Sequence, residues 1–186
     1  MFYLVTGGSA SGKSAWAEAL SGAIAEDVSG TCVYLATMQP KGNEAMERIK
    51  KHRLQREGRG FFTIEQSRDL ETVDLAAIPE VPRDTSVVLL ECLGTLLANE
   101  MFSDAGVFLG REHSVHRVID GVAHLRTQVP NLIAVTNEVG SAGWDFDDLV
   151  LEYIDALGEI NCRLANEADV VVEVMAGMPN VVKGKV

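Results

Sequence analysis

The stretch at residues 7–14 constrains the fold more than any other part of this sequence. It reads Gly-Gly-Ser-Ala-Ser-Gly-Lys-Ser and satisfies every fixed position of the pattern G-x-x-x-x-G-K-[ST]. The apolar run at residues 2–5 predicts a buried strand before it, and strong helix formers follow at residues 15–20. A strand, a glycine-rich turn and a helix in this order gather backbone N–H groups and a helix N-terminus around one anion. The sequence therefore predicts a binding site for nucleotide phosphates rather than a turn that binds nothing.

The residues of this loop have distinct expected roles. Gly7, Gly8 and Gly12 allow the tight turn that points backbone N–H groups into one concavity. Lys13 is expected to reach the β- and γ-phosphates as a catalytic residue, and the Ser14 hydroxyl is expected to bind Mg²⁺. We expect the whole loop to contact the nucleotide, through Gly7, Gly8, Ser9, Ala10, Ser11, Gly12, Lys13 and Ser14.

Composition limits the class of protein. A chain of 186 residues with 47% hydrophobic content can bury one substantial core, so we expect residues 1–186 to form a single domain. The net charge of −11 argues against a nucleic-acid partner. The sequence shows neither a bilayer-spanning apolar run nor a secretory signal, and Cys32, Cys92 and Cys162 form no C-x-x-C pair. A cytoplasmic protein with reduced thiols and no membrane insertion is expected.

Strand and helix signals alternate along the chain. Apolar runs predict strands at residues 2–6, 32–36, 61–64, 87–90, 132–136, 170–174 and 181–183. Helices are predicted at 13–26, 43–57, 69–77, 93–102 and 111–129, and an amphipathic stripe runs from 146 to 164. Such alternation is typical of a mainly parallel sheet covered by helices on both faces, which binds ligands at the carboxyl ends of its strands.

Polar residues stand where several of these strands end. Thr37, Glu65, Glu91, Asn137 and Glu138 are therefore candidate binding residues. Glu91 follows four aliphatic residues on the predicted central strand, so we expect it to bind Mg²⁺ or to polarise a nucleophile. From spacing alone, an acid that merely caps the strand fits equally well.

A basic segment interrupts the acidic chain. Residues 41–59 contain seven Lys or Arg and three Glu, so the segment is +4 and the rest of the chain is −15. This charge fits either a local polyphosphate site or a solvated helix face. His52 lies inside the segment, where surrounding cations favour a neutral and hence nucleophilic imidazole. Because His52 shares a helical stripe with Ala45 and Ile49, a packed structural histidine is the alternative.

Four blocks of residues give the chain a family resemblance. They are the loop with Ala17-Glu18; Tyr34 to Thr37 with Glu44, Met46, Arg48-Ile49 and His52-Arg53; residues 89–93; and Asn137 to Gly140 with Asp155, Gly158, Asn161, Ala168-Asp169 and residues 176–179. The chain thereby resembles the bifunctional adenosylcobinamide kinases / adenosylcobinamide-phosphate guanylyltransferases of cobalamin biosynthesis. The combination of R-I-x-x-H-R with N-E-V-G is far more selective than the phosphate loop alone.

The resemblance implies an activity and a site. Adenosylcobinamide would be phosphorylated with ATP or GTP, and GMP would then pass from GTP through His52 to give adenosylcobinamide-GDP and pyrophosphate. The resemblance also implies helper roles for Arg48, Lys51 and Arg53, Mg²⁺ held by Ser14 and Glu91, and a homo-oligomer, expected to be a trimer. The implied fold is an α/β fold of the P-loop NTPase type, with three layers and a RecA-like sheet.

Two departures from the family keep rival functions open. Ala10 stands where the family has arginine, and residues 151–154 replace family arginines. A small-molecule kinase without guanylyl transfer and a non-catalytic nucleotide-binding module are the alternatives.

Overall fold

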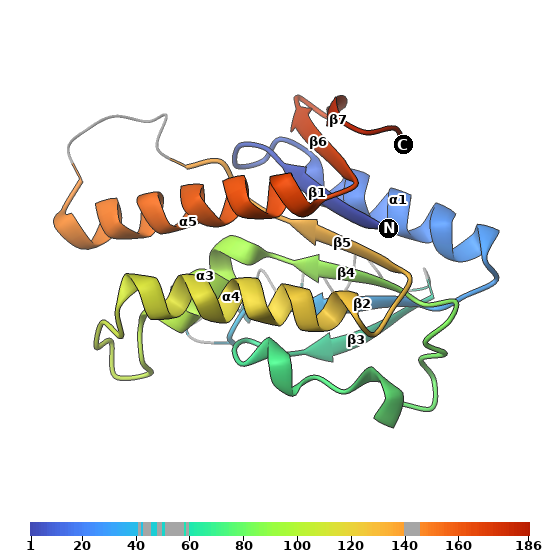
Figure 1. Ribbon diagram of the computed structural model, residues 1–186, viewed down its shortest axis with the longest axis horizontal. Coiled ribbons are helices and arrows are strands. Elements are labelled where there is room, and N and C mark those ends of the chain that lie inside the picture. The colour runs from blue at the N-terminus through green and yellow to red at the C-terminus, as the bar shows by residue number, and fades with distance from the viewer. Residues whose placement is uncertain (41, 43–45, 48–49, 51–57, 59, 140–145) are drawn as a thin grey trace.

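The computed structural model describes residues 1–40, 42, 46–47, 50, 58, 60–139 and 146–186. Its centre is one seven-stranded sheet in the order β3-β2-β4-β5-β1-β6-β7 (Figure 1). Six strands are parallel, and β7 alone runs antiparallel to its neighbour β6. The strands are β1 (Phe2–Thr6), β2 (Cys32–Ala36), β3 (Phe61–Glu65), β4 (Val87–Glu91), β5 (Asn131–Val135), β6 (Val170–Met175) and β7 (Met178–Lys183). The predicted mainly parallel sheet is confirmed.

Helices cover both faces of this sheet. They are α1 (Lys13–Asp27) on one face and α3 (Leu93–Met101), α4 (Arg111–Arg126) and α5 (Asp148–Glu167) on the other (Figure 1). Strand β4 shows how the sequence builds this arrangement. Val87 and Leu89 pack with α1 while Val88 and Leu90 pack with α3 and α4, because successive side chains of a strand point to opposite faces. An uninterrupted aliphatic run is therefore what a central parallel strand requires.

The predicted helix at residues 69–77 is wrong. The chain instead forms two 3-10 turns, η1 (Leu70–Thr72) and η2 (Leu75–Ala77), with extended backbone at Val73 between them. The Asp74 carboxylate accepts a hydrogen bond from the Ala76 N–H and starts the second turn. The Gln128 side chain bonds the backbone on either side of Asp74. Its Oε1 accepts from Leu75 N, and its Nε2 donates to Val73 O.

Two further helix predictions need correction. The helix predicted to reach residue 129 ends at Arg126, since Thr127 and Gln128 turn back onto the carbonyls of His124 and Leu125. The apolar stripe at 146–164 is buried only in its second half, where α5 packs over the sheet. Leu149, in the first turn, is 47% exposed. The helix predicted at 43–57 lies outside the described residues.

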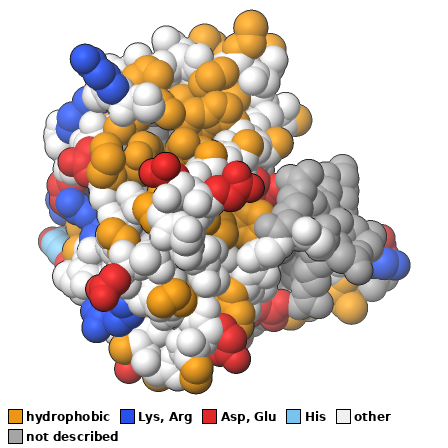
Figure 2. Space-filling view, turned by 90° about the vertical axis from the view of Figure 1, so that its right-hand side faces the viewer, with side chains coloured by type: hydrophobic (Ala, Val, Ile, Leu, Met, Phe, Trp, Pro, Cys, Tyr) orange, Lys and Arg blue, Asp and Glu red, His pale blue; other side chains and the backbone are white. Residues whose placement is uncertain are grey.

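The hairpin of β6 and β7 leaves apolar side chains in solvent. All six residues of β7 are exposed, and Met178 and Val182 are 68% and 63% exposed. Figure 2 shows hydrophobic side chains gathered at the top of the molecule, where Figure 1 places β6 and β7. None of the helices in the described part of the chain has the length and apolarity of a membrane span.

Gly30 offers a sharp test of this packing. A Cβ at this position would lie 1.7 Å from the carbonyl oxygen of Thr85, so backbone would have to move. Gly30→Ala should lower the free energy of unfolding by about 3 kcal/mol, at the upper end for overpacking, as measured by urea denaturation. Gly22 lies inside α1 with nothing within 4 Å of such a Cβ, so Gly22→Ala should raise stability. Equal losses in the two variants would contradict the close approach at Gly30.

Candidate functional site

The loop after β1 lies at the carboxyl edge of the sheet and leads directly into α1. Gly12 caps the N-terminus of α1 with a φ of 92°, a backbone conformation that favours glycine. A Cβ at Gly12 would lie 3.0 Å from the Cα of Gly177, and Gly177 N donates to Ser11 O at 2.7 Å. The turn between β6 and β7 therefore supports the loop from one side and fixes its shape.

Two residues of the loop stand out. Ala10 has a φ of 56°, in the left-handed region that a non-glycine residue seldom occupies. The Ser11 Oγ is buried and has no hydrogen-bond partner within the described part of the chain. A buried hydroxyl in that state costs free energy, so a loop that carries it fits the arrival of a polar ligand.

Lys13 is the first residue of α1 and is buried within this loop. Its Nζ donates to the carbonyl oxygen of Gly8 at 3.0 Å, so the side chain folds back across the loop. Burial lowers the pKa of Lys13, while the neighbouring Cys92 and Glu91 act to raise it. The lysine and the acid at the end of β4 are therefore close enough to interact.

Glu91 is held at the end of β4 by contacts from β2. Tyr34 donates its hydroxyl proton to Glu91 Oε2 at 3.2 Å. The Glu91 carbonyl oxygen accepts from Thr37 N at 3.0 Å and from Thr37 Oγ1 at 3.1 Å. Strand alternation places the Glu91 side chain on the α1 face, together with Val87 and Leu89. Glu91 thus lies on the same face of the sheet as Lys13.

Thr37 joins the exits of β2 and β4. Its Oγ1 accepts from Cys92 N at 2.9 Å, and its carbonyl oxygen accepts from Asn99 Nδ2 at 2.8 Å. The Thr37 side chain is fully buried. Its contacts with a nucleotide stay a prediction.

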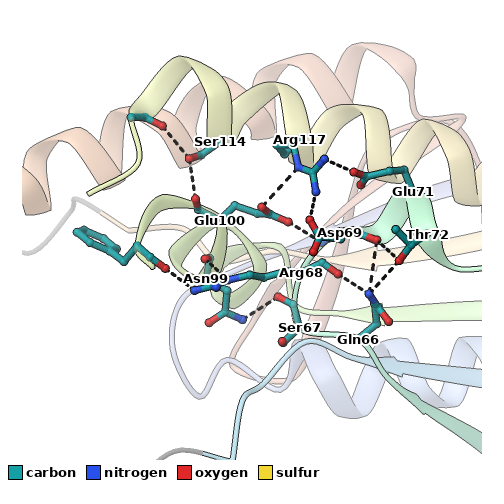
Figure 3. Close-up of polar contacts among 12 residues, drawn as sticks. Gln66, Ser67, Arg68, Asp69, Glu71, Thr72, Asn99, Glu100, Ser114 and Arg117 are labelled. Carbon is teal, nitrogen blue, oxygen red and sulfur yellow. Dashed lines mark hydrogen bonds and ion pairs between the residues drawn. The ribbon is translucent and has the colours of Figure 1, made fainter. Parts of the chain in front are cut away.

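The loop after β3 wraps around the C-terminal end of α3, as Figure 3 shows. Asn99 Nδ2 also donates to Ser67 O at 2.9 Å, and Arg68 donates to the carbonyl oxygens of Asn99 and Phe102. The next residue of α3, Glu100, accepts from Asp69 N and pairs with Arg117 of α4. Burial raises the pKa of Glu100, and Glu71 raises it further. These contacts anchor α3, and with it the backbone of Thr37.

Asn137 and Glu138 follow β5 and border the phosphate loop. Glu138 N donates to Gly7 O at 3.2 Å. Asn161 of α5 holds the turn, because its Nδ2 donates to Asn137 O at 3.2 Å while its Oδ1 accepts from Thr136 Oγ1 at 2.7 Å. The structure therefore brings the exits of β1, β4 and β5 together.

Glu65 is a predicted site residue that lies away from the phosphate loop. Glu65 ends β3, which is separated from β1 by β2, β4 and β5, a span of roughly 19 Å at the usual strand spacing. Its binding role stays a prediction. His52, Arg48, Lys51 and Arg53 lie outside the described residues.

Three residues of the site had no role predicted from the sequence. They are Tyr34, whose hydroxyl holds Glu91, Asn99, which holds Thr37, and Asn161, which holds Asn137. The two asparagines are polar residues within helical patterns, which is a weak signal. Nothing in the sequence indicates that Tyr34 reaches across to β4.

The residues at this edge fit a magnesium ion. Mg²⁺ takes oxygen ligands and keeps several waters, so one or two protein ligands suffice beside substrate phosphates. Ser14 in the first turn of α1 and the carboxylate of Glu91 supply such oxygens. Among the described residues, no group of three or more His, Cys, Asp and Glu could hold a metal by itself. Two oxygen donors of this kind would suit a metal ion that nucleotide phosphates also bind.

Comparisons with known proteins identify relatives of this chain. A family model described as cobinamide kinase / cobinamide phosphate guanyltransferase matches residues 3–182. The chain is 32% identical over 186 residues to the bifunctional adenosylcobalamin biosynthesis protein CobU of Escherichia coli (strain K12), covering 96% of this chain and 97% of that protein. It is 34% identical over 191 residues to the protein of the same name from Salmonella typhimurium, with 96% and 97% covered.

Solved structures resemble the chain in fold. The KaiC-like protein PH0186 from Pyrococcus horikoshii matches with a TM-score of 0.50 at 14% identity, covering 92% of this chain and 69% of that one. With the sheet order and the loop before α1, this likeness confirms the expected three-layer, RecA-like fold of the P-loop NTPase type.

Proposed function

We propose that this chain, which belongs to the cobinamide kinase / cobinamide phosphate guanyltransferase family, phosphorylates adenosylcobinamide and then converts the phosphate into adenosylcobinamide-GDP. The observation that carries the proposal is the phosphate loop itself, in which the buried Lys13 folds its Nζ onto the Gly8 carbonyl oxygen and the buried Ser11 Oγ has no partner among the described residues. One domain, residues 1–186, would carry both reactions.

The kinase step needs little covalent chemistry from the protein. The substrate hydroxyl oxygen attacks the γ-phosphorus of ATP or GTP, the bond from that phosphorus to the β-phosphate oxygen breaks, and the hydroxyl proton passes to water. The loop N–H groups and Lys13 stabilise the charge on the phosphates. Mg²⁺, held by Ser14 and Glu91, would neutralise further charge on the nucleotide. Asn137 and Glu138 border this site.

The transfer step uses His52 as the nucleophile. Its imidazole nitrogen attacks the α-phosphorus of GTP, a P–N bond forms, and pyrophosphate leaves. A phosphate oxygen of adenosylcobinamide phosphate then attacks the same phosphorus, which breaks the P–N bond and restores the imidazole. Arg48, Lys51 and Arg53 would offset the negative charge.

A turnover assay tests this function. The chain is incubated with adenosylcobinamide, GTP and Mg²⁺, and the products are separated by chromatography and identified by mass. Adenosylcobinamide phosphate should form first and the GDP conjugate second, with one pyrophosphate for each conjugate. Formation of adenosylcobinamide phosphate without the GDP conjugate would mean that the chain is only a kinase. Nucleotide that binds but is never consumed would mean that it is only a nucleotide-binding module. Replacing GTP by ATP reports the nucleotide that each step accepts.

Self-association, with a trimer as the expected state, is part of the proposal. The exposed apolar side chains of the β6–β7 hairpin support it, since surfaces of this kind mark contacts between chains. Val182 has no partner in the register between β6 and β7, so its replacement leaves that pairing intact.

We expect Val182→Asp to shift the chain toward monomer in sedimentation experiments, because a charge at an apolar contact loses its solvation. Val182→Thr keeps the shape of the side chain and should keep the assembly. An unchanged assembly in Val182→Asp would place the contact elsewhere.

A cytoplasmic location completes the proposal. Cys32, Cys92 and Cys162 are free thiols, as a reducing compartment would keep them.

A further inference from the structure

Tyr34 is a buried tyrosine whose hydroxyl reaches the functional edge of the sheet. Its side chain is only 4% exposed and lies in the core between the sheet and α1. The Phe61 ring of β3 meets the Tyr34 ring edge-on, with centroids 6.4 Å apart. Packing from β3 and α1 therefore fixes the ring, and the hydroxyl at its tip has little freedom of its own.

The hydroxyl of Tyr34 contacts one defined oxygen of Glu91. Leu89 of β4 is the register partner of Tyr34, and Ala36 of β2 is the register partner of Glu91. The tyrosine thus reaches forward along the strand to donate to Glu91 Oε2 at 3.2 Å. A glutamate has three side-chain torsions, and a fixed donor on one oxygen restricts them. The second oxygen, Oε1, is then held in a defined direction as an acceptor.

We propose that Tyr34 is a positioning residue that orients the Glu91 carboxylate for the magnesium ion of the bound nucleotide. The proposal rests on the function proposed above, in which Glu91 binds that ion. A hydrogen-bonded partner behind a metal-binding carboxylate orients the ligand, and loss of such a partner typically weakens metal affinity about 10- to 100-fold. The phenol is suited to this role because it donates one proton and brings no charge that would compete with the metal.

The test measures metal affinity rather than turnover. Mn²⁺ replaces Mg²⁺, and its binding to the chain with a non-hydrolysable GTP analogue is followed by electron paramagnetic resonance. Tyr34→Phe keeps the ring and its packing, and it should weaken Mn²⁺ binding about 10-fold. Tyr3→Phe is the matched control, because Tyr3 is a buried tyrosine of the same core whose hydroxyl contacts the Met1 sulfur instead. Its Mn²⁺ affinity should equal that of the unaltered chain.

A double variant shows whether Tyr34 acts through Glu91. Glu91→Gln should weaken Mn²⁺ binding, and Tyr34→Phe with Glu91→Gln should be no weaker than Glu91→Gln alone, since coupled residues do not add. Additive losses would make Tyr34 a general structural residue and overturn the inference. An unchanged affinity in Tyr34→Phe beside a loss in Glu91→Gln would also overturn it, yet leave the proposed metal role of Glu91 standing. An unchanged affinity in Glu91→Gln would overturn both.

Discussion

Lys13→Met is expected to slow both proposed reactions of the chain strongly. Methionine keeps most of the length of the side chain but removes the ammonium that we expect to meet the β- and γ-phosphates, so turnover should fall by on the order of 10²–10³-fold. Nucleotide affinity should fall as well, because we expect the same charge to hold the ground-state triphosphate. Product formation and binding of a fluorescent GTP analogue measure the two effects.

The fold should survive this change. Lys13 pays a desolvation cost in its buried position, as its lowered pKa shows, so methionine suits the site and thermal unfolding should not shift downward. Lys185→Met makes the same replacement at an exposed residue near the C-terminus and should leave turnover intact. Turnover by Lys13→Met near that of the unaltered chain would contradict the role of the loop.

The elements that position this lysine could be predicted from the sequence. The strand at residues 2–6 and the helix that begins at Lys13 follow from local signals, namely a buried apolar run and a glycine-rich turn. The central strand at Val87–Glu91 could be predicted as well, because a continuous aliphatic run is typical of a parallel strand that is buried on both faces. Local pattern and tertiary structure agree at these elements.

The errors arose where distant groups override the local pattern. Residues 69–77 lack a helix because Gln128, more than fifty residues later in the chain, bonds the backbone on both sides of Asp74. The apolar stripe of α5 begins before the part of the helix that packs into the core, so Leu149 stays exposed. Periodicity reports which face of a helix is apolar, and it does not report where the neighbouring helices end.

The candidate site, like the fold, could be predicted only in part from the sequence. The rule that parallel strands bind ligands at their carboxyl ends predicted the place of Glu91 and Asn137. Glu65 was also predicted as a binding residue, and the sheet order places three strands between β3 and β1, so its binding role stays a prediction. The contacts of Tyr34 and Asn99 depend on side-chain reach between strands and helices, which no single segment of sequence encodes.

His52→Ala is expected to separate the two reactions. With GTP labelled at the α-phosphate and no corrinoid present, the unaltered chain should acquire a label that is stable to base and labile to acid, as a P–N bond is. In His52→Ala the label should fall by on the order of 10³-fold or more, because the proposed nucleophile is removed. Phosphorylation of adenosylcobinamide should continue, since the phosphate loop and Lys13 are untouched.

This separation distinguishes a nucleophile from a structural histidine. A packed histidine would, on removal, lower stability and slow both reactions together, whereas a nucleophile affects one of them. His116→Ala is the matched control, because His116 is exposed on α4 and, within the described part of the chain, its hydrogen-bond partner is the Glu112 carbonyl oxygen one turn earlier. It should keep both the label and the kinase. A full label in His52→Ala would assign the transfer to another residue, and the basic segment would then be the solvated face that its charge alone also allows.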